Sequence, residues 1–306
     1  MGSTPTSGTN LCGFAAGGRQ AAVDGRSGAH TGRFRTPVIT LIVLVLVAVA
    51  AGMLGAMLGV GGGIVIVPVL TLFLNVPVKS AIGTSLVCVV VTSSASQIVY
   101  VARGFTNSRL GMTLEVATTL GALVGGVTAI LASGRAIFAV FAAVLIYVLF
   151  SMERKPPPLL PVDPRSALGG SFVDPDTGRE VAYGVDHLPG GLALSFVAGN
   201  VSGLLGVGGG AIKVPVMTLL MRVPLRAAIA TSNLMIGVTA ATGALIFFGR
   251  GLVEPRYAVP AALGILVGAQ LGTRVANRVS AALLRRVFEV LLAVFAVQMA
   301  LKAFGI

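Results

Sequence analysis

Long apolar runs, separated by short polar gaps, occupy most of the chain from residue 37 onward. The runs are roughly 20 residues long and show little of the period-2 alternation that membrane β-strands show. A segment in lipid must satisfy its backbone hydrogen bonds, and an α-helix does so within itself. The pattern therefore predicts an all-α, polytopic helical membrane protein. The expected apolar segments are 38–58, 63–74, 80–102, 111–132, 135–151, 188–207, 210–221, 226–249, 257–273 and 283–301.

Polar segments divide the chain into four parts. Residues 1–36 are rich in Gly, Ser, Thr and Arg and carry too little apolar surface to fold, so they are interpreted as a polar N-terminal tail. Residues 37–152 and 188–306 each contain five apolar segments, and the second segment of each half is too short to span a bilayer. Residues 153–187, with three consecutive prolines, form the predicted linker between the halves.

The two halves are copies of each other. A shift of 147 positions aligns them without a gap and places Leu58–Gly63 on Leu205–Gly210. Of the 28 positions from Leu58 to Ser85, 17 are identical, which shared hydrophobicity alone does not explain. Five crossings per half, or three if the first two segments form a re-entrant hairpin, would turn the copies upside down relative to each other, whereas four would leave them parallel. We favour inverted repeats.

Composition argues against several classes of function. Of the 306 residues, 10% are charged, against about 25% in an ordinary soluble domain. The net charge of +12 reflects Arg residues that lie mostly between apolar runs, as topology determinants do, so nucleic-acid binding is not expected. The two Cys and two His residues form no metal-ligating cluster, and neither Glu115 nor Glu289 suggests a proton relay. We expect no enzyme, no cofactor and no metal.

A glycine-rich break interrupts the apolar pattern once in each half, at Gly59–Gly63 and at Gly206–Gly210. The helix that starts there presents unpaired N–H groups and the positive end of its dipole. Discontinuous helices at matching places in two halves are typical of transporter binding sites, and such helix ends favour an anion. Close helix packing is the competing explanation, less favoured because the triple glycine recurs with identical flanks. The predicted ligands are Gly61, Gly62, Gly63, Gly208, Gly209 and Gly210.

Polar side chains next to the breaks are further candidate ligands. Lys213 lies within an apolar segment where the first half has Ile66, and a cation at mid-membrane costs about 2.5–3.5 kcal/mol on insertion scales. It is a candidate anion ligand unless its side chain snorkels to a nearby interface. Hydroxyl and amide groups can also hold anionic oxygens, although helix-to-helix hydrogen bonding explains them equally well. The candidates of this kind are Thr84, Ser85, Thr231, Ser232 and Asn233.

These motifs resemble those of a known family. The doubled Leu-Gly-x-Gly-Gly-Gly-x-x-x-Val-Pro, followed by Val-Pro-x-Lys/Arg-x-Ala-x-x-Thr-Ser, is similar to the pattern of the sulfite exporter TauE/SafE family, from about Val38 to the C-terminus. The resemblance implies a multi-pass protein of the bacterial inner membrane that transports sulfite, sulfoacetate, other organosulfonates or related organic anions. It also implies coupling to an ion gradient, with a proton as a candidate coupling ion, rather than to ATP.

Three functions remain open on the sequence. The favoured one is a secondary transporter, acting as an exporter by alternating access around a midplane anion site at the paired broken helices. An anion channel at the same site would need a continuous wet path instead. A non-transporting membrane scaffold would have no polar cavity at the breaks. The expected partners of the transporter are a small sulfur-containing or organic anion and the lipid bilayer.

Overall fold

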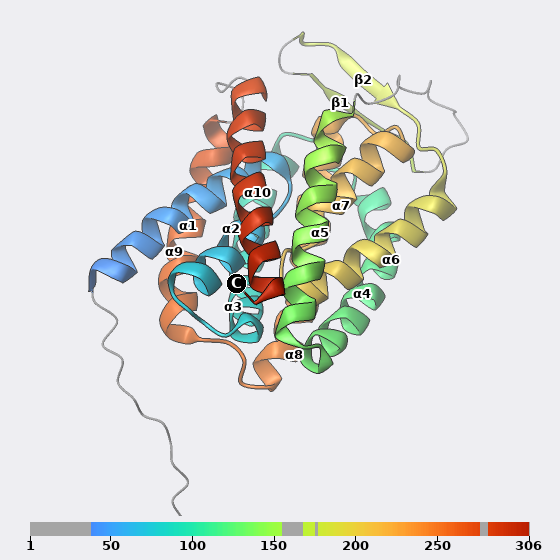
Figure 1. Ribbon diagram of the computed structural model, residues 1–306. Helices are drawn as coiled ribbons and strands as arrows, with labels where there is room; N and C mark the ends of the chain where they lie inside the picture. The colour runs from blue at the N-terminus through green and yellow to red at the C-terminus, as the bar shows by residue number, and fades with distance from the viewer. Residues whose placement is uncertain (1–37, 155–167, 175–176, 276–280, 306) are drawn as a thin grey trace, which may run out of the picture. The chain divides into compact units, whose positions relative to one another are not determined.

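The computed structural model describes residues 38–154, 168–174, 177–275 and 281–305 (Figure 1). The predicted polar tail lies outside the described residues. The first half contains α1 (Val38–Leu58), α2 (Gly63–Pro68), the π-helical segment η1 (Val69–Phe73), α3 (Val78–Ala102), α4 (Ser108–Leu131) and α5 (Gly134–Glu153). The linker contains strands β1 (Gly170–Val173) and β2 (Glu180–Tyr183). The second half contains α6 (Leu188–Leu205), α7 (Gly210–Pro215), the π-helical segment η2 (Val216–Leu220), α8 (Leu225–Gly249), α9 (Pro255–Val275) and α10 (Ala281–Phe304).

Within these residues, eight helices are long and apolar enough to cross a membrane. The two short segments, Gly63–Phe73 and Gly210–Leu220, fall where the sequence predicts segments too short to span. Many large side chains exposed on the long helices are apolar, for example Leu46, Leu131 and Phe304, as expected of surfaces that face lipid. The prediction of an all-α, polytopic membrane protein is confirmed.

A proline determines the local structure of each short segment. Pro68 ends α2 and Pro215 ends α7, and in both cases the next five residues adopt π-helical spacing. Proline has no N–H and its ring clashes with the carbonyl four residues earlier, so the regular helical ladder is interrupted there. Thr71 then donates its hydroxyl back to Val67 O at 2.9 Å, and the second repeat has the equivalent bond. The two repeats thus share this local structure.

The helices recur at the 147-residue spacing that relates the two halves of the sequence. α3 corresponds to α8, and α2 to α7, over their full lengths. Their packing is reciprocal: α1 of the first repeat packs against α9 of the second, and α6 of the second packs against α4 of the first (Figure 1). α3 packs against its own counterpart α8, and α5 against α10. Such mutual contacts are those of two units related by a twofold axis.

Counterpart helices run in opposite directions where they meet. Near the start of α3, Gly83 lies beside Phe247 at the end of α8, and further along α3, Ser93 lies beside Gly237. A twofold axis between antiparallel counterparts is perpendicular to them, so the two copies would cross a bilayer in opposite senses. The orientation of the two repeats relative to a membrane stays a prediction.

Glycines away from the breaks let helices of different repeats approach closely. An ideal Cβ on Gly125 of α4 would lie 1.9 Å from Asn200 O of α6. In the α1–α9 pair, an ideal Cβ on Gly268 would lie 2.0 Å from Val49 O. Backbone contact at these distances requires glycine, as at many membrane helix interfaces. The packing explanation therefore applies to these glycines.

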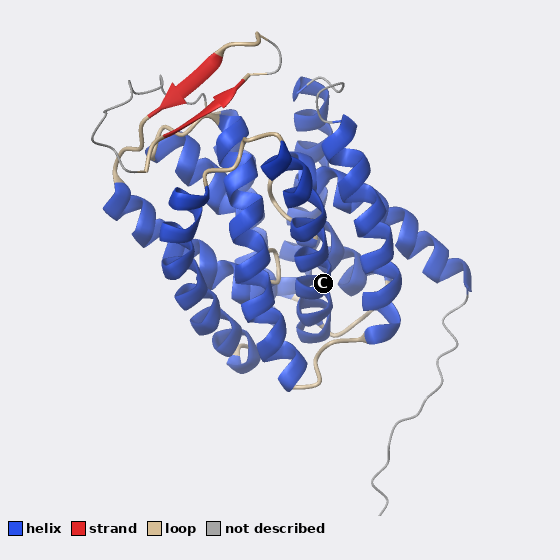
Figure 2. Ribbon diagram, turned by 180° about the vertical axis from the view of Figure 1, so that it is seen from behind, coloured by secondary structure: helices blue, strands red, loops and turns tan. Residues whose placement is uncertain are grey.

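The inter-half linker contains a β-hairpin that the sequence analysis does not predict. β1 and β2 pair antiparallel at one end of the helices (Figure 2). Phe172 of β1 lies edge-on to Phe105, with ring centroids 5.6 Å apart, and Tyr183 of β2 is buried beside them. Arg226 at the start of α8 forms an ion pair with Asp174, which follows β1. The hairpin is thus held against the segment before α4 and against the start of α8.

Candidate functional site

The two glycine breaks adopt backbone conformations that other residues rarely take. Gly61 and Gly62 have φ angles of 79° and 39°, and Gly208 and Gly209 have φ angles of 85° and 74°. A Cβ is strained in this left-handed region, so these positions favour glycine. After each turn the chain starts the short helix α2 or α7. The predicted glycine-broken helix is therefore confirmed in both repeats.

The breaks of the two repeats lie directly against each other. An ideal Cβ on Gly63 would lie 2.5 Å from Gly206 O, and one on Gly210 would lie 2.1 Å from Gly59 O. Each break thus presents backbone, without an intervening side chain, to the other repeat. The six candidate glycines, three from each repeat, therefore lie close together in the interior of the protein.

A buried serine of each repeat donates a hydrogen bond to the glycine break of the other repeat. Ser85 Oγ donates to Gly206 O at 2.9 Å, and its counterpart Ser232 Oγ donates to Gly59 O at 3.0 Å. Both serines are fully buried. Their hydroxyl protons are engaged by backbone carbonyls, which is the helix-to-helix bonding that the sequence leaves as the alternative to anion binding. An anion could receive these hydroxyl protons only after the serine–carbonyl bonds part.

The candidate threonines hold connecting segments. Thr84 Oγ1 accepts a hydrogen bond from Glu254 N at 3.1 Å, and Thr231 Oγ1 accepts one from Asn107 N at 3.0 Å. Glu254 and Asn107 lie at corresponding places, just before α9 and α4. Each threonine therefore positions the entry to a helix of the opposite repeat.

Asn233, next to Ser232, bonds to the end of α1. Its Nδ2 donates to Ala56 O at 3.3 Å and to Ile229 O at 3.1 Å. Its Oδ1 is buried and has no hydrogen-bond partner among the described residues. The side chain thus places an unpaired acceptor close to the first break.

Lys213 belongs to a buried polar cluster built from three helices. The side chain is 1% exposed, and its Nζ donates to Thr239 Oγ1 of α8 at 2.7 Å. Nζ also lies 3.4 Å from Glu115 Oε2 of α4, and Thr239 Oγ1 lies 2.6 Å from Glu115 Oε1. Thr119 Oγ1 donates to the same Oε1 at 3.1 Å. The ammonium is paired in the interior, so the snorkelling explanation is wrong.

Glu115, which the sequence did not suggest as a proton relay, is the carboxylate partner of Lys213. The carboxylate lies 98 positions from Lys213 in the sequence, two turns into α4, and it is 5% exposed. A buried charge without a partner is expensive, so a buried Lys in an apolar segment signals that a carboxylate lies nearby. Few carboxylates lie in the apolar segments, so the sequence alone could have singled out Glu115 as a candidate partner of Lys213.

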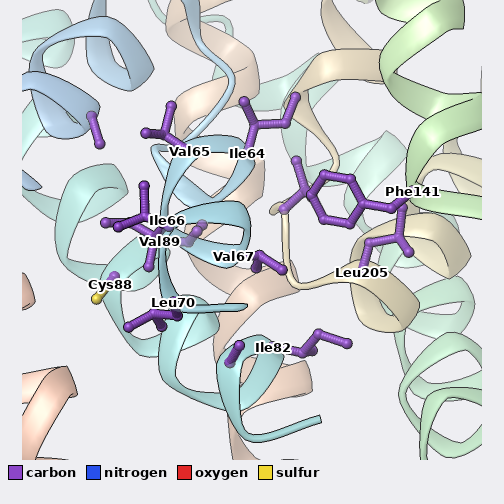
Figure 3. Close-up of a cluster of buried hydrophobic side chains, with 14 of the residues drawn as sticks. Ile64, Val65, Ile66, Val67, Leu70, Ile82, Cys88, Val89, Phe141 and Leu205 are labelled. Carbon is purple, nitrogen blue, oxygen red and sulfur yellow. The ribbon is translucent and has the colours of Figure 1, made fainter. Parts of the chain in front are cut away.

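The first repeat has no such cluster at the corresponding place. Ile66, the counterpart of Lys213, lies among apolar side chains that include Val89, together with Cys88 (Figure 3). Thr92, the counterpart of Thr239, donates to Cys88 O at 3.0 Å. The backbone of the two breaks is symmetric, but their chemistry is not: among the described residues a buried charged pair lies beside the second break and none lies beside the first.

Duplicated helical repeats with opposed glycine breaks define a multi-pass membrane protein with the architecture of a transporter. The chain belongs to the sulfite exporter TauE/SafE family, whose family model matches residues 44–299. It is accordingly a membrane transporter and not an enzyme.

Similar proteins from bacteria and an archaeon carry transporter names. The chain is 28% identical over 268 residues to "Probable membrane transporter protein YunE" of Bacillus subtilis, covering 85% of this chain and 97% of the relative. A "Probable membrane transporter protein" of Xylella fastidiosa strain Temecula1 is 29% identical over 82% of this chain and 90% of the relative. The corresponding values for MJ0441 of Methanocaldococcus jannaschii are 24%, 86% and 96%. No solved structure matches the chain significantly.

Proposed function

We propose that this chain is a secondary transporter, working as an exporter, for sulfite, sulfoacetate, other organosulfonates or related small organic anions. The observation that carries the proposal is the pair of glycine breaks that face each other across the repeat interface. Broken helices at matching places in two repeats are the arrangement in which many secondary transporters bind their substrates. The family description, a sulfite exporter, supports the substrate class and the direction.

An anion suits this position for electrostatic reasons. The segments Gly63–Phe73 and Gly210–Leu220 both start at the breaks, so their N–H groups and positive dipole ends lie near the repeat interface. Lys213 places an ammonium one turn into the second segment, where it is paired with the Glu115 carboxylate until an anion replaces that partner. The proposed ligands are the backbone groups at the breaks, the hydroxyls of Ser85 and Ser232 once their bonds part, and the Lys213 ammonium.

The reciprocal packing of the repeats supports alternating access. When two inverted copies exchange conformations, the site between them opens first to one side and then to the other. The Ser85–Gly206 and Ser232–Gly59 bonds join the copies at the site. These bonds must part in turn as each side opens, so they are the contacts that the transport cycle breaks and remakes.

The test is flux of radiolabelled sulfite through the purified full-length chain in proteoliposomes. A transporter gives saturable flux that unlabelled sulfite on the opposite side accelerates, because the loaded site returns faster than the empty one. Gly209→Ala, which places a Cβ 2.9 Å from Ala198 O, should reduce the flux strongly. Gly251→Ala is the matched control, because Gly251 also has positive φ but has open space around it.

Three results would contradict the proposal. Flux that rises linearly with sulfite concentration and is not accelerated from the opposite side indicates an anion channel. Absence of flux for sulfite, sulfoacetate and other sulfonates indicates that this substrate class is wrong. Equal loss of flux in Gly209→Ala and Gly251→Ala would remove the breaks from the site.

A further inference from the structure

We propose that Glu115 and Lys213 form a proton-coupled anion site, in which protonation of Glu115 releases Lys213 from its carboxylate partner and a substrate anion takes the place of that carboxylate. The inference rests on the proposed function and deepens it, because it names the coupling ion and the residues that bind it. It also reverses the expectation from the sequence that Glu115 is no proton relay.

The charged pair is enclosed by groups that can serve either ligand. α4 packs against α6 and α8, and the groups that contact the Glu115 carboxylate are Thr119 of its own helix, Lys213 of α7 and Thr239 of α8. Lys213 is the titratable group among these contacts in the described part of the chain. The cluster is electrically neutral while Glu115 is ionised and Lys213 is charged. Uptake of one proton by Glu115 therefore leaves one positive charge for an anion to balance.

A buried hydroxyl without a partner lies next to the pair. Ser202 of α6 is fully buried, and its Oγ has no hydrogen-bond partner among the described residues. An ideal Cβ on Gly209 would lie 3.2 Å from Ser202 Cβ and 3.4 Å from Lys213 Cε, so the two side chains flank the same glycine at the start of α7. Buried donors are normally paired, and an incoming anionic oxygen would supply the acceptor that Ser202 lacks.

Thr239 is placed to change partners. Its hydroxyl lies 2.6 Å from Glu115 Oε1 and 3.0 Å from Met235 O, and it has a single proton to donate. When Glu115 is ionised, the proton goes to the carboxylate. When Glu115 is protonated, the proton is free for Met235 O or for an anion held by Lys213. The same hydroxyl can therefore serve the empty and the loaded states of the site.

The site is single, because the position related to it by the repeat lacks both ionisable groups. The counterparts of Lys213, Glu115 and Ser202 at a shift of 147 are Ile66, Ala262 and Gly55. Figure 3 shows the surroundings of Ile66 as a cluster of apolar side chains. One proton and one monoanion per chain then enter the cluster together, and their release on the other side restores the Glu115–Lys213 pair with charge conserved. Because the proton and the anion move in the same direction, export through this site requires an outward anion gradient that exceeds any opposing proton gradient.

The experiment measures proton uptake when an anion binds to the purified full-length protein. The probe is ethanesulfonate, which keeps a single negative charge across the pH range, whereas sulfite itself takes up a proton near neutral pH. Calorimetry in two buffers of different ionisation enthalpy gives the number of protons taken up, and infrared difference spectra show whether a carboxyl group becomes protonated. Sulfite binding and flux are measured in parallel.

We expect one proton per ethanesulfonate, a protonated-carboxyl band, and an affinity that falls about tenfold for each rise of one pH unit wherever one proton is taken up per anion. Glu115→Gln should bind without proton uptake, without the band and without pH dependence, because Gln resembles the protonated acid. Lys213→Met should weaken binding at least tenfold. Glu153→Gln, which removes an exposed carboxylate at the end of α5, is the control and should behave as wild type.

The outcomes separate the two proposals. Ethanesulfonate binding to wild type without proton uptake overturns the coupling site and leaves the anion transporter intact. A proton count and band that persist in Glu115→Gln assign the coupling to another group and overturn the role of Glu115. If neither anion binds or moves, the proposed function fails and this inference fails with it. Should Glu115→Gln not fold, the wild-type proton count and infrared band still decide.

Discussion

Replacing Lys213 with Met should destabilise the fold, because it leaves the Glu115 carboxylate buried without a counter-ion. Lys213 Nζ lies 3.4 Å from Glu115 Oε2, and the side chains are 1% and 6% exposed. At that separation the Coulomb attraction is about 5 kcal/mol for an effective dielectric constant of about 20. Desolvation of both charges offsets much of this attraction, so the intact pair contributes little net stability. Removing one partner leaves an uncompensated charge and costs about 3–5 kcal/mol.

The assay is a double-variant cycle in unfolding free energy, measured on the purified protein in mixed micelles. Lys213→Met should cost about 3–5 kcal/mol, and Glu115→Gln should cost a similar amount because it strands the ammonium. The double variant should cost much less than the two single variants together, because it strands neither charge. Lys79→Met combined with Glu115→Gln is the control and should be additive, because Lys79 Nζ donates to the carbonyl of Ile130. Additive costs for the Lys213 and Glu115 pair would refute the reasoning.

Three further predictions test the repeat packing and the hairpin. Ser85→Ala and Ser232→Ala should each reduce the unfolding free energy by about 1 kcal/mol, and clearly unequal losses would contradict a twofold relation between their bonds. Gly125→Ala should destabilise because its Cβ would meet a backbone oxygen at 1.9 Å, whereas Gly249→Ala, with open space around it, should not; equal effects in unfolding assays would count against close α4–α6 contact. Burial raises the pKa of Tyr183. The contribution of its neutral phenol to hairpin docking is therefore present below about pH 10 and is lost as the pH rises further. Tyrosinate absorbance that titrates as in a free peptide would contradict this prediction.

The helices were predictable because a membrane leaves few choices for the backbone. The segment expected at 38–58 is α1, and the segments expected to be too short appear as Gly63–Phe73 and Gly210–Leu220. The β-hairpin was missed because its strands have four residues each and only Phe172 and Tyr183 are buried in them. So few apolar positions give almost no periodic signal, and docking against Phe105 supplies the stability that the hairpin lacks alone.

The glycine breaks were predictable because a repeated glycine run has a direct backbone meaning. The partner of Lys213 was not predictable, because it belongs to the other repeat and the alignment of the repeats does not show which helix faces meet. Glu115 reaches Lys213 because α4 packs against α6 and α8 of the second repeat. The serine bonds have the same origin: Ser85 and Ser232 each donate across the repeat interface. Side-chain partners that depend on contacts between the repeats cannot be predicted from the sequence of either repeat alone.

A transport site at the paired breaks should open to one side of the membrane at a time. The accessibility of a cysteine placed between the breaks tests this most directly. Ile236 is fully buried and lies beside both Gly61 and Gly208, so Ile236→Cys, with Cys12 and Cys88 replaced by Ser, reports on this position. The reagent is a membrane-impermeant methanethiosulfonate that carries a sulfonate, applied to oriented vesicles from one side or the other. Alternating access predicts labelling from either side, at rates that change in opposite directions when an anion gradient is imposed, and protection by ethanesulfonate, which, unlike sulfite, does not cleave the reagent. Labelling from neither side, or labelling that ethanesulfonate does not reduce, would contradict alternating access at the breaks.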